Sequence, residues 1–204
     1  MRDIIYKKIK RVLDILLSII FLIITSPIII IISIIVMIQF KHLPIYKQQR
    51  VGKNGKLFNI YKFQTMVDNS QAIFDSFPNE LKIKYYKNYK LDNDPRITKM
   101  GYILRKLSLD ELPQLVNVLK GEMSLVGPRP VIKEELKKYG NKTNKLLSVK
   151  PGMTGFWQVN GHNDLTYNQR INLDMFYVDN ISLKLDTLIL IKTFTIFFKR
   201  KENK

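Results

Sequence analysis

An apolar segment near the N-terminus constrains this chain most. Residues 15–40 form 26 consecutive positions without a charged side chain, and isoleucine is the commonest residue among them. A helix of that length can cross a hydrocarbon layer of about 30 Å. A cleaved signal peptide would have a shorter apolar region, of roughly 7–15 residues, followed by a small-residue cleavage site. Neither feature is present, so the sequence predicts stable association with a membrane.

Two features bear on how this segment meets the membrane. Ser26-Pro27 lies in its middle, and a proline inside a helix removes a hydrogen-bond donor and kinks or breaks the helix. Basic residues also flank both ends: Lys7, Lys8, Lys10 and Arg11 on one side, Lys41, His42, Lys47 and Arg50 on the other. Since lysine and arginine favour the cytoplasmic side, two topologies remain open. One is a single spanning helix, and the other is a re-entrant hairpin that bends at Ser26-Pro27.

The lead-in to this segment contains an acid at the membrane boundary. Arg11 and Asp14 are three positions apart, which makes them neighbours on one face of a helix. We expect them to form a structural ion pair.

Composition narrows the class of partner. The 204 residues include 34 Lys and Arg against 17 Asp and Glu, giving a net charge of +17. Such an excess implies an anionic partner, which could be nucleic acid, anionic lipid or a phosphorylated substrate. A hydrophobic content of 46% is too high for a disordered basic tail. The absence of cysteine excludes disulfides, thiolate metal sites and a cysteine nucleophile.

The chain divides into a basic lead-in and membrane segment over residues 1–42 and a domain over residues 43–204. The domain is predicted to be helix-rich α+β, with amphipathic helices at the membrane interface. Asn54-Gly55 between two apolar runs predicts a β-hairpin, because both residues readily adopt positive φ. Residues 68–94 are interpreted as a polar, partly helical insertion. Residues 185–198 are apolar and too short to span, which is typical of an interfacial or buried helix.

Adjacent carboxylates occur at Asp110-Glu111. Ser108 and Glu111 have the spacing of a helix capping box, in which acids in the first turn also offset the helix dipole. Adjacent carboxylates can equally hold Mg²⁺ or attack phosphorus. The structural and the chemical interpretations are compatible.

Two loops are candidates for substrate contact. Gly127-Pro128-Arg129-Pro130 sets one arginine in a stiff loop, which suits bidentate phosphate binding but equally fits an ordinary surface turn. Residues 150–164 contain three glycines and the single tryptophan. They could bind a base or sugar or form a closely packed turn. Lys62, judged from its neighbours alone, is a solvent-exposed strand lysine.

Taken together, these pieces resemble the bacterial sugar transferase family of monotopic phosphoglycosyl transferases. The resemblance extends from Lys10 nearly to the end of the chain. Its motifs are Lys10-Arg11…Asp14, Ser26-Pro27, Lys62-Phe63-x-Thr65-Met66, Asp94-Pro95-Arg96-Ile97-Thr98, Leu109-Asp110-Glu111-Leu112-Pro113-Gln114, Gly127-Pro128-Arg129-Pro130 and Pro151-Gly152-x-Thr154-Gly155.

The resemblance implies a reaction and a location. Family members transfer a sugar 1-phosphate from a UDP-sugar to undecaprenyl phosphate, release UMP and initiate capsule, exopolysaccharide or O-antigen synthesis. They use a re-entrant helix in the bacterial cytoplasmic membrane, with the catalytic domain on the cytosolic face. By resemblance, Asp110 is the nucleophile that forms a covalent phosphosugar intermediate, and Glu111 binds Mg²⁺ beside it. Lys62, Arg129 and Asp186 match substrate or phosphate positions, and His162 stands at a further such position.

Two departures from the family pattern leave an alternative open. Gln64 stands where the family usually has arginine, and so does His162, whose charge depends on pH. The alternative is a catalytically impaired membrane scaffold of polysaccharide assembly. Residues 156–167 look more like the hexose-phosphate branch of the family, which favours galactose or glucose 1-phosphate.

The sequence disfavours a third alternative, a membrane-tethered nucleic-acid-binding module. Such a module would cluster basic and aromatic residues on a recognised fold, and it would leave Asp110-Glu111 without a role. The expected partners are therefore membrane lipids, a UDP-hexose and undecaprenyl phosphate. A homodimer is compatible with the sequence, but no residue indicates it.

Overall fold

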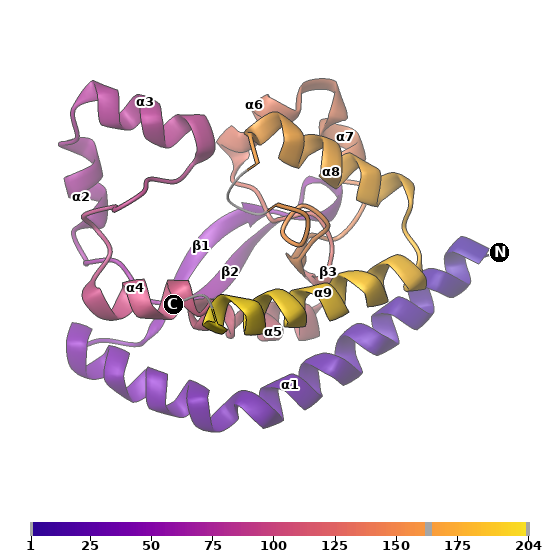
Figure 1. The fold of residues 1–204 in the computed structure, drawn as a ribbon, viewed down its shortest axis with the longest axis horizontal. Helices are drawn as coiled ribbons and strands as arrows, with labels where there is room; N and C mark the ends of the chain where they lie inside the picture. The colour runs from indigo at the N-terminus through magenta and orange to yellow at the C-terminus, as the bar shows by residue number, and fades with distance from the viewer. Residues whose placement is uncertain (1, 162–164, 203–204) are drawn as a thin grey trace. The chain divides into compact units, whose positions relative to one another are not determined.

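The computed structural model describes residues 2–161 and 165–202 and is helix-rich with two small sheets (Figure 1). The helices are α1 (Arg2–Phe40), α2 (Ser70–Asp75), α3 (Asn79–Asn88), α4 (Lys99–Lys106), α5 (Gln114–Lys120), α6 (Leu136–Tyr139), α7 (Thr143–Leu146), α8 (Tyr167–Asp179) and α9 (Leu183–Glu202). The strands are β1 (Ile45–Val51), β2 (Leu57–Phe63), β3 (Ser124–Val126) and β4 (Gly152–Thr154). The predicted helix-rich α+β class is confirmed.

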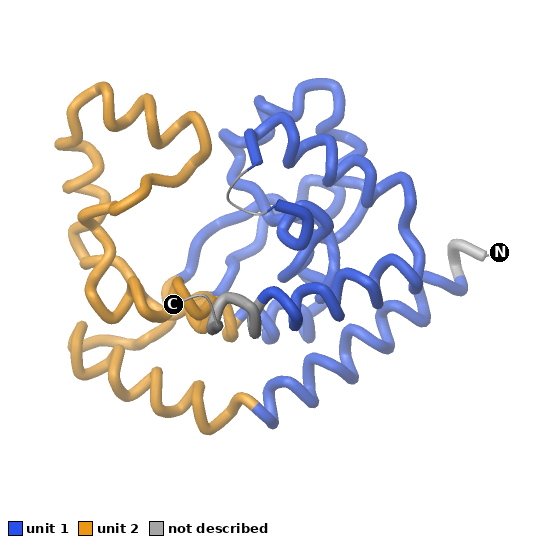
Figure 2. The backbone as a smooth tube through the Cα atoms, viewed as in Figure 1, with its two compact units in different colours: residues 1–24, 47–61, 114–204 blue, residues 25–46, 62–113 orange. Residues whose placement is uncertain are grey.

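The chain forms two compact units (Figure 2). Unit 1 contains residues 1–24, 47–61 and 114–204, and unit 2 contains residues 25–46 and 62–113. Helix α1 and the strands β1 and β2 each contribute residues to both units. The predicted division at residue 42 concerns the membrane and stays a prediction, whereas the compact units divide the chain differently.

Helix α1 is continuous from Arg2 to Phe40, with Pro27 inside it. The prediction of two helices broken at Ser26-Pro27 is therefore wrong at the level of secondary structure. Proline removes one hydrogen bond from the helix, but the helix continues through this position. Whether the helix enters and leaves the membrane on one side stays a prediction.

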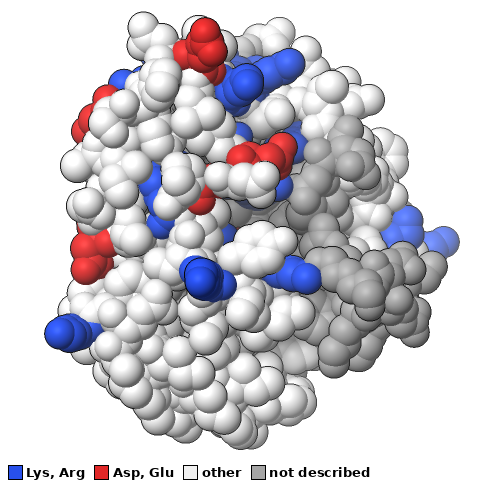
Figure 3. Space-filling view, turned by 60° about the vertical axis from the view of Figure 1, so that its left-hand side comes forward, with Lys and Arg blue, Asp and Glu red and all other residues white. Residues whose placement is uncertain are grey.

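The surface of α1 is apolar. Among the described residues it is the one helix long and apolar enough to cross a membrane, and only 11% of its most apolar window is buried within the protein. Figure 3 shows the lower part of one face, where α1 lies, as almost free of charged residues. Exposed apolar surface of this extent is typical of lipid contact, so the structure supports membrane association.

Polar contacts attach the first part of α1 to unit 1. The Arg11 guanidinium donates to the carbonyl oxygens of Val118 and Leu119 at 2.6 and 2.8 Å. These carbonyls lie in the last turn of α5, where the helix leaves acceptors without a partner. The Asp14 carboxylate accepts from the backbone N–H of Leu125 at 3.0 Å and from the Ser124 hydroxyl at 3.1 Å.

The predicted ion pair between Arg11 and Asp14 is therefore wrong. In the part of the chain that the structure describes, each side chain bonds to a different element of unit 1 instead. Helical spacing makes Arg11 and Asp14 neighbours, but each side chain forms hydrogen bonds with residues more than 100 positions away in the sequence.

The main core of unit 1 lies between β2, α5, β3 and α9. Its buried residues are Phe58, Ile60, Leu115, Val118, Met123, Leu125, Val126, Val159, Tyr177 and Ile189. A second cluster, which includes Val131, Tyr139 and Ile171, packs beneath α6, α7 and α8. The predicted helix over residues 185–198 is confirmed within α9. Ile189 is fully buried, whereas Leu188 and Ile191 on the same helix are exposed.

Glycines bring two loops of unit 1 into backbone contact. Strand β3 pairs in parallel with β4, and Ser124 lies opposite Gly152. Beyond β3, the N–H of Gly127 donates to Thr154 at 2.9 Å, and the N–H of Gly152 donates to Pro128 at 2.8 Å. A Cβ atom on Gly152 would lie 2.1 Å from the nitrogen of Gly127. Only glycine fits there, and the contact holds the loop that carries Arg129.

The predicted β-hairpin is confirmed. Strands β1 and β2 pair in a two-stranded sheet, and their connection places Asn54 at φ 57° and Gly55 at φ 77°. The turn is longer than a two-residue loop because residues 53–55 form a short 3₁₀ turn.

Unit 2 has two apolar clusters. In the first, Ile32 and Val36 of α1 pack with Phe63 and Leu104. The second lies within the insertion over residues 68–94, which contains α2 and α3 and is therefore partly helical, as predicted. Its aromatic rings surround the Arg96 guanidinium, which is 4.9 Å from the Phe74 centroid and forms two hydrogen bonds to Asp94 through its side chain.

Gly152→Ala tests the backbone contact between the two loops. We expect it to cost at least about 3 kcal/mol of folding free energy, because backbone atoms must move to admit the methyl group. For a chain of this size that lowers Tm by roughly 6–12 °C. Thermal unfolding of the purified protein in detergent measures the change.

Gly55→Asn is the matched control. Gly55 also has positive φ, but no heavy atom lies within 4 Å of its Cβ position, and asparagine tolerates this conformation. We expect a change within about 0.5 kcal/mol. Equal losses in both variants would contradict the close-approach argument.

Candidate active site

The Asp110-Glu111 pair lies on a short 3₁₀ turn, Leu109–Glu111, between α4 and α5. Ser108 precedes it in the left-handed conformation, at φ 53° and ψ 22°, and its side chain makes no cap hydrogen bond. The predicted capping box is therefore wrong, and α5 begins later, at Gln114. A left-handed residue with a side chain costs roughly 1–2 kcal/mol, and such strain is found preferentially at functional sites.

The Asp110 carboxyl group is buried, with 6% of the residue exposed. Its pKa is raised to about 6: burial is the largest cause, the negative charge of Glu111 adds to it, and the charges of Lys62 and Arg105 oppose the increase. Glu111 in turn accepts a hydrogen bond from the Lys62 ammonium group at 2.8 Å. Lys62 is thus a half-buried member of this group rather than the solvent-exposed strand lysine that its neighbours suggest.

Sequence analysis missed Arg105, which belongs to the same group. This arginine lies in the last turn of α4, and its Nε donates to the Thr65 hydroxyl at 2.9 Å. Burial lowers its pKa, and the charge of Asp110 opposes the decrease. Its position five residues before Asp110 and its contact with the motif residue Thr65 are the signals that could have identified it.

Gln64, which replaces the usual arginine of the family pattern, is bonded locally. Its side-chain amide donates to the carbonyl oxygen of Met66 at 2.8 Å. The residue therefore stabilises its own backbone segment and brings no positive charge to the group around Asp110.

Asp110 and Glu111 suit a magnesium ion that is shared with a substrate. No group of three or more His, Asp or Glu able to hold a metal is found among the described residues. Magnesium, however, is commonly held by one or two carboxylates together with waters and substrate phosphates. Burial is the largest cause of the raised pKa of Asp110 and the negative charge of Glu111 is the second, so a divalent cation beside the two carboxylates would favour the ionised form. The two carboxylates therefore fit this ion without forming a protein cage around it.

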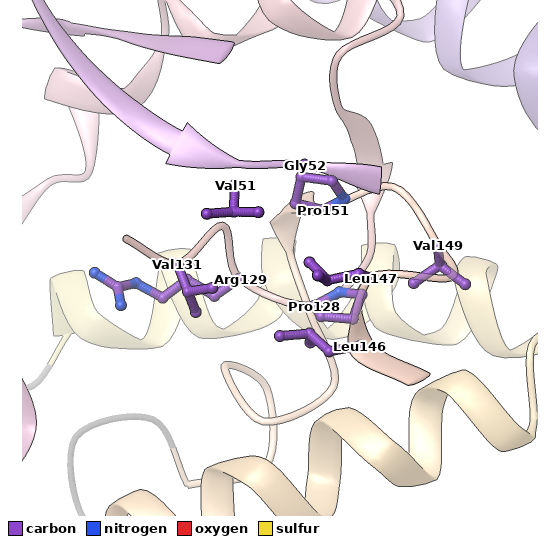
Figure 4. A pocket seen from close by; sticks show the side chains of 9 residues that line it. All are labelled: Val51, Gly52, Pro128, Arg129, Val131, Leu146, Leu147, Val149 and Pro151. Carbon is purple, nitrogen blue, oxygen red and sulfur yellow. The ribbon is translucent and has the colours of Figure 1, made fainter. Parts of the chain in front are cut away.

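Arg129 belongs to unit 1, whereas Lys62, Asp110 and Glu111 belong to unit 2. Its guanidinium donates to the buried Glu135 carboxylate at 3.3 Å, and 34% of its side chain is exposed. The residues around a small hollow beside it are Val51, Gly52, Pro128, Val131, Leu146, Leu147, Val149 and Pro151. Figure 4 shows the guanidinium of Arg129 pointing away from these apolar side chains.

The Asp186 carboxylate is engaged within unit 1. One oxygen accepts from the Lys10 ammonium and the Tyr6 hydroxyl, both at 2.8 Å, and the other accepts from the Tyr177 hydroxyl at 2.7 Å. These bonds connect α1, α8 and α9, which is a structural role. Its predicted part in substrate binding stays a prediction.

The loop over residues 150–164 is described in part. Trp157 is buried, and the Arg170 guanidinium lies 4.9 Å from its ring centroid. This contact favours the closely packed turn over an open aromatic surface for a base. His162 lies outside the described residues.

Comparison with known proteins identifies relatives along most of the chain. A family model described as bacterial sugar transferase matches residues 5–200. The undecaprenyl-phosphate galactose phosphotransferase of Salmonella typhimurium is 48% identical over 199 residues, which cover 94% of this chain and 40% of that protein. The UDP-galactose-lipid carrier transferase of Erwinia amylovora is 48% identical over 160 residues, covering 77% and 34%. The exopolysaccharide production protein ExoY of Sinorhizobium fredii is 42% identical over 187 residues, covering 90% and 83%.

The chain therefore spans two fifths or less of the first two relatives and most of the third. The family match over residues 5–200 includes both Asp110-Glu111 and Gly127-Pro128-Arg129-Pro130.

Asp110→Asn tests the electrostatic description of this turn. The folded protein holds the pKa of Asp110 at about 6, above the ordinary value of 3.8. Ionisation of Asp110 therefore reduces stability as pH rises from 3.8 to about 6, and the reduction is complete above that range. We expect Asp110→Asn to raise Tm by up to about 6–12 °C at pH 8, which corresponds to roughly 3 kcal/mol, and by less at pH 5.

Asp92→Asn is the control, since the Asp92 side chain is 97% exposed. Its Tm should match that of the wild type at both pH values. A fall in Tm for Asp110→Asn at pH 8 would show that the charged carboxylate is stabilising and would contradict the described balance.

Proposed function

Since the chain belongs to the bacterial sugar transferase family, we propose that it transfers a hexose 1-phosphate from a UDP-sugar to undecaprenyl phosphate and releases UMP. The names of the Salmonella and Erwinia relatives support this acceptor and donor, and both name galactose. Galactose 1-phosphate is therefore the preferred group, with glucose 1-phosphate as the second donor to test. The product would begin a surface polysaccharide, a role that the name of the Sinorhizobium relative supports.

The observation that carries the proposal is the buried Asp110 carboxylate beside Glu111 and Lys62. A carboxylate with little hydration and a pKa near 6 is ionised at pH 7 yet poorly solvated, which makes it an effective nucleophile. Its oxygen attacks the phosphorus that bears the sugar. A phosphorus–oxygen bond of the diphosphate breaks, UMP leaves with that electron pair, and an aspartyl phosphosugar remains.

The second step regenerates the enzyme. An oxygen of the lipid phosphate attacks the same phosphorus, the bond to Asp110 breaks, and the carboxylate is restored. Two displacements of this kind separate the departure of UMP from the arrival of the lipid. In this proposal the Lys62 ammonium, which donates to Glu111 at 2.8 Å, binds phosphate charge during both steps, and Arg129 is the candidate contact for the donor diphosphate.

A magnesium ion held by Asp110 and Glu111 would neutralise diphosphate charge and help UMP to leave. Independently of that ion, Lys62 and Arg105 keep the Asp110 carboxylate ionised near neutral pH, since both lower its pKa.

Helix α1 supports a place at the cytosolic face of the bacterial inner membrane. Basic residues flank both ends of its apolar stretch, and lysine and arginine favour the cytoplasmic side. We propose that α1 enters the membrane from the cytosolic side, bends at Pro27 and returns to the same side. The catalytic domain then stays at the membrane surface, where the phosphate group of an acceptor lipid is accessible to it.

A second candidate is a membrane scaffold with little activity. Gln64 favours it, because its amide is bonded to Met66 and supplies no cation where the family usually has arginine. The complete group of Asp110, Glu111, Lys62 and Arg105 favours catalysis.

UMP release is the direct test. Full-length protein with undecaprenyl phosphate and Mg²⁺ would be given UDP-galactose or UDP-glucose. We expect UMP from one donor with the wild type, and a loss of at least about 1,000-fold in Asp110→Asn because the nucleophile is absent. The exposed Asp92→Asn serves as control and should retain activity. UMP release from Asp110→Asn at the wild-type rate would refute the nucleophile, and a folded wild type inactive with both donors would favour the scaffold.

The pH profile tests the role of Lys62. Protonated Asp110 cannot attack, so kcat/KM should rise with pH through about 6. Lys62 lowers the pKa of Asp110, so Lys62→Met should move this limb to higher pH. Lys56→Met, at an exposed lysine of the hairpin turn, should leave the limb where it is. A lower rate in Lys62→Met with an unmoved limb would show that Lys62 acts only on substrate.

A further inference from the structure

We propose that Glu135 is a positioning residue that holds the Arg129 guanidinium in place for the diphosphate of the donor. This inference rests on the proposed function, in which Arg129 contacts that diphosphate. Glu135 follows the Arg129 loop at the end of a short 3₁₀ turn, Lys133–Glu135, and only 1% of it is exposed.

The Glu135 carboxylate is fully engaged. Its Oε1 accepts from Arg50 at 3.2 Å and from the N–H of Ile132 at 3.3 Å. Its Oε2 accepts from Arg129 at 3.3 Å and from the Tyr167 hydroxyl at 2.9 Å. A carboxylate has about four lone-pair sites, so these donors fix its orientation. A fixed acceptor in turn fixes the direction of the guanidinium that it binds.

Glu135 and its partner Arg50 hold both the Arg129 side chain and the backbone of the loop that carries it. Arg50, which pairs with Glu135, also donates to the carbonyl oxygen of Pro130 at 3.1 Å. Arg50 is 7% exposed, whereas 34% of the Arg129 side chain is exposed. The buried members therefore hold one partly exposed arginine from two directions. A long side chain that is already ordered loses less conformational entropy when an anion binds.

Two guanidinium groups lie at one hollow beside this cluster. Its lining includes Arg129, Glu135, Trp157, Tyr167, Arg170 and Asp174. Burial lowers the pKa of Arg170 and the positive charge of Arg129 lowers it further, so the two guanidinium groups repel each other. Burial raises the pKa of Asp174 to about 7, and this carboxyl group is therefore only partly ionised at neutral pH. An anion bound in this hollow would lie beside the guanidinium groups of both Arg129 and Arg170.

A double-mutant cycle on nucleotide binding tests the proposal. The full-length protein would be titrated with UDP and, separately, with uridine, using the wild type, Glu135→Gln, Arg129→Met and the double variant. We expect Glu135→Gln to weaken UDP binding about tenfold and uridine binding little, because only UDP carries the diphosphate. In the Arg129→Met background, Glu135→Gln should have no further effect on UDP. Additive losses, or equal losses for UDP and uridine, would overturn the positioning role.

A milder variant covers a failure to fold, since Glu135→Gln leaves the buried Arg50 without its counter-charge. Tyr167→Phe removes one donor to Oε2 while retaining the ring, and it should weaken UDP binding about threefold in the wild-type background only. Tyr102→Phe, at a tyrosine that is 59% exposed, is the control and should bind UDP normally. A threefold loss that persists in the Arg129→Met background would again overturn the proposal.

The binding cycle and the UMP assay fail separately. If the wild type binds UDP but releases no UMP from either donor, the proposed activity is overturned and the cycle remains readable. If UMP is released but Arg129→Met binds UDP as the wild type does, the positioning role of Glu135 is overturned and the activity stands.

Discussion

Polar contacts along one face of α1 determine how unit 1 is assembled. Isoleucine gains little by leaving lipid for protein, because both surroundings are apolar. The few polar side chains of the helix therefore decide which face meets the protein. Tyr6, Lys10 and Asp14 are four positions apart and lie on one face, and Arg11 is adjacent. Between them they bond to the last turn of α5, to β3 and to Asp186 of α9.

Those contacts extend to the Arg129 loop through the backbone. Asp14 binds β3 at Leu125, and β3 continues into Gly127 and the loop that carries Arg129. Gly152 lies against Gly127 so closely that no side chain fits. The helix α1 therefore positions the strand β3, and β3 positions the loop. The position of Arg129, near a proposed phosphate site, thus depends on the Asp14 contact at the start of the membrane segment.

The outcome of sequence analysis follows the range of each interaction. Asn54-Gly55 specified a hairpin because its positive φ angles are local properties. The ion pair at Arg11 and Asp14 and the capping box at Ser108 were also local predictions, and both failed because tertiary partners or strain prevailed. The Asp110-Glu111 pair was recognisable from the sequence, but the raised pKa of Asp110 was not, because burial is a property of the folded chain. Glu135 escaped notice because nothing near it in sequence shows that two distant side chains, Arg50 and Tyr167, converge on it together with Arg129.

Arginine and lysine contribute differently to the large positive charge of this chain. Of the 34 basic residues, eight are arginine and 26 are lysine. Each arginine whose side chain is described bonds to, or lies over, a specific partner: Arg11, Arg50, Arg96, Arg105, Arg129 and Arg170. The planar guanidinium fork suits such fixed geometry, whereas the lysine ammonium remains well hydrated. Most lysines instead add positive charge at the surface, and such a field attracts anionic partners. Lys10 and Lys62 are exceptions, because each bonds to a carboxylate at a defined distance.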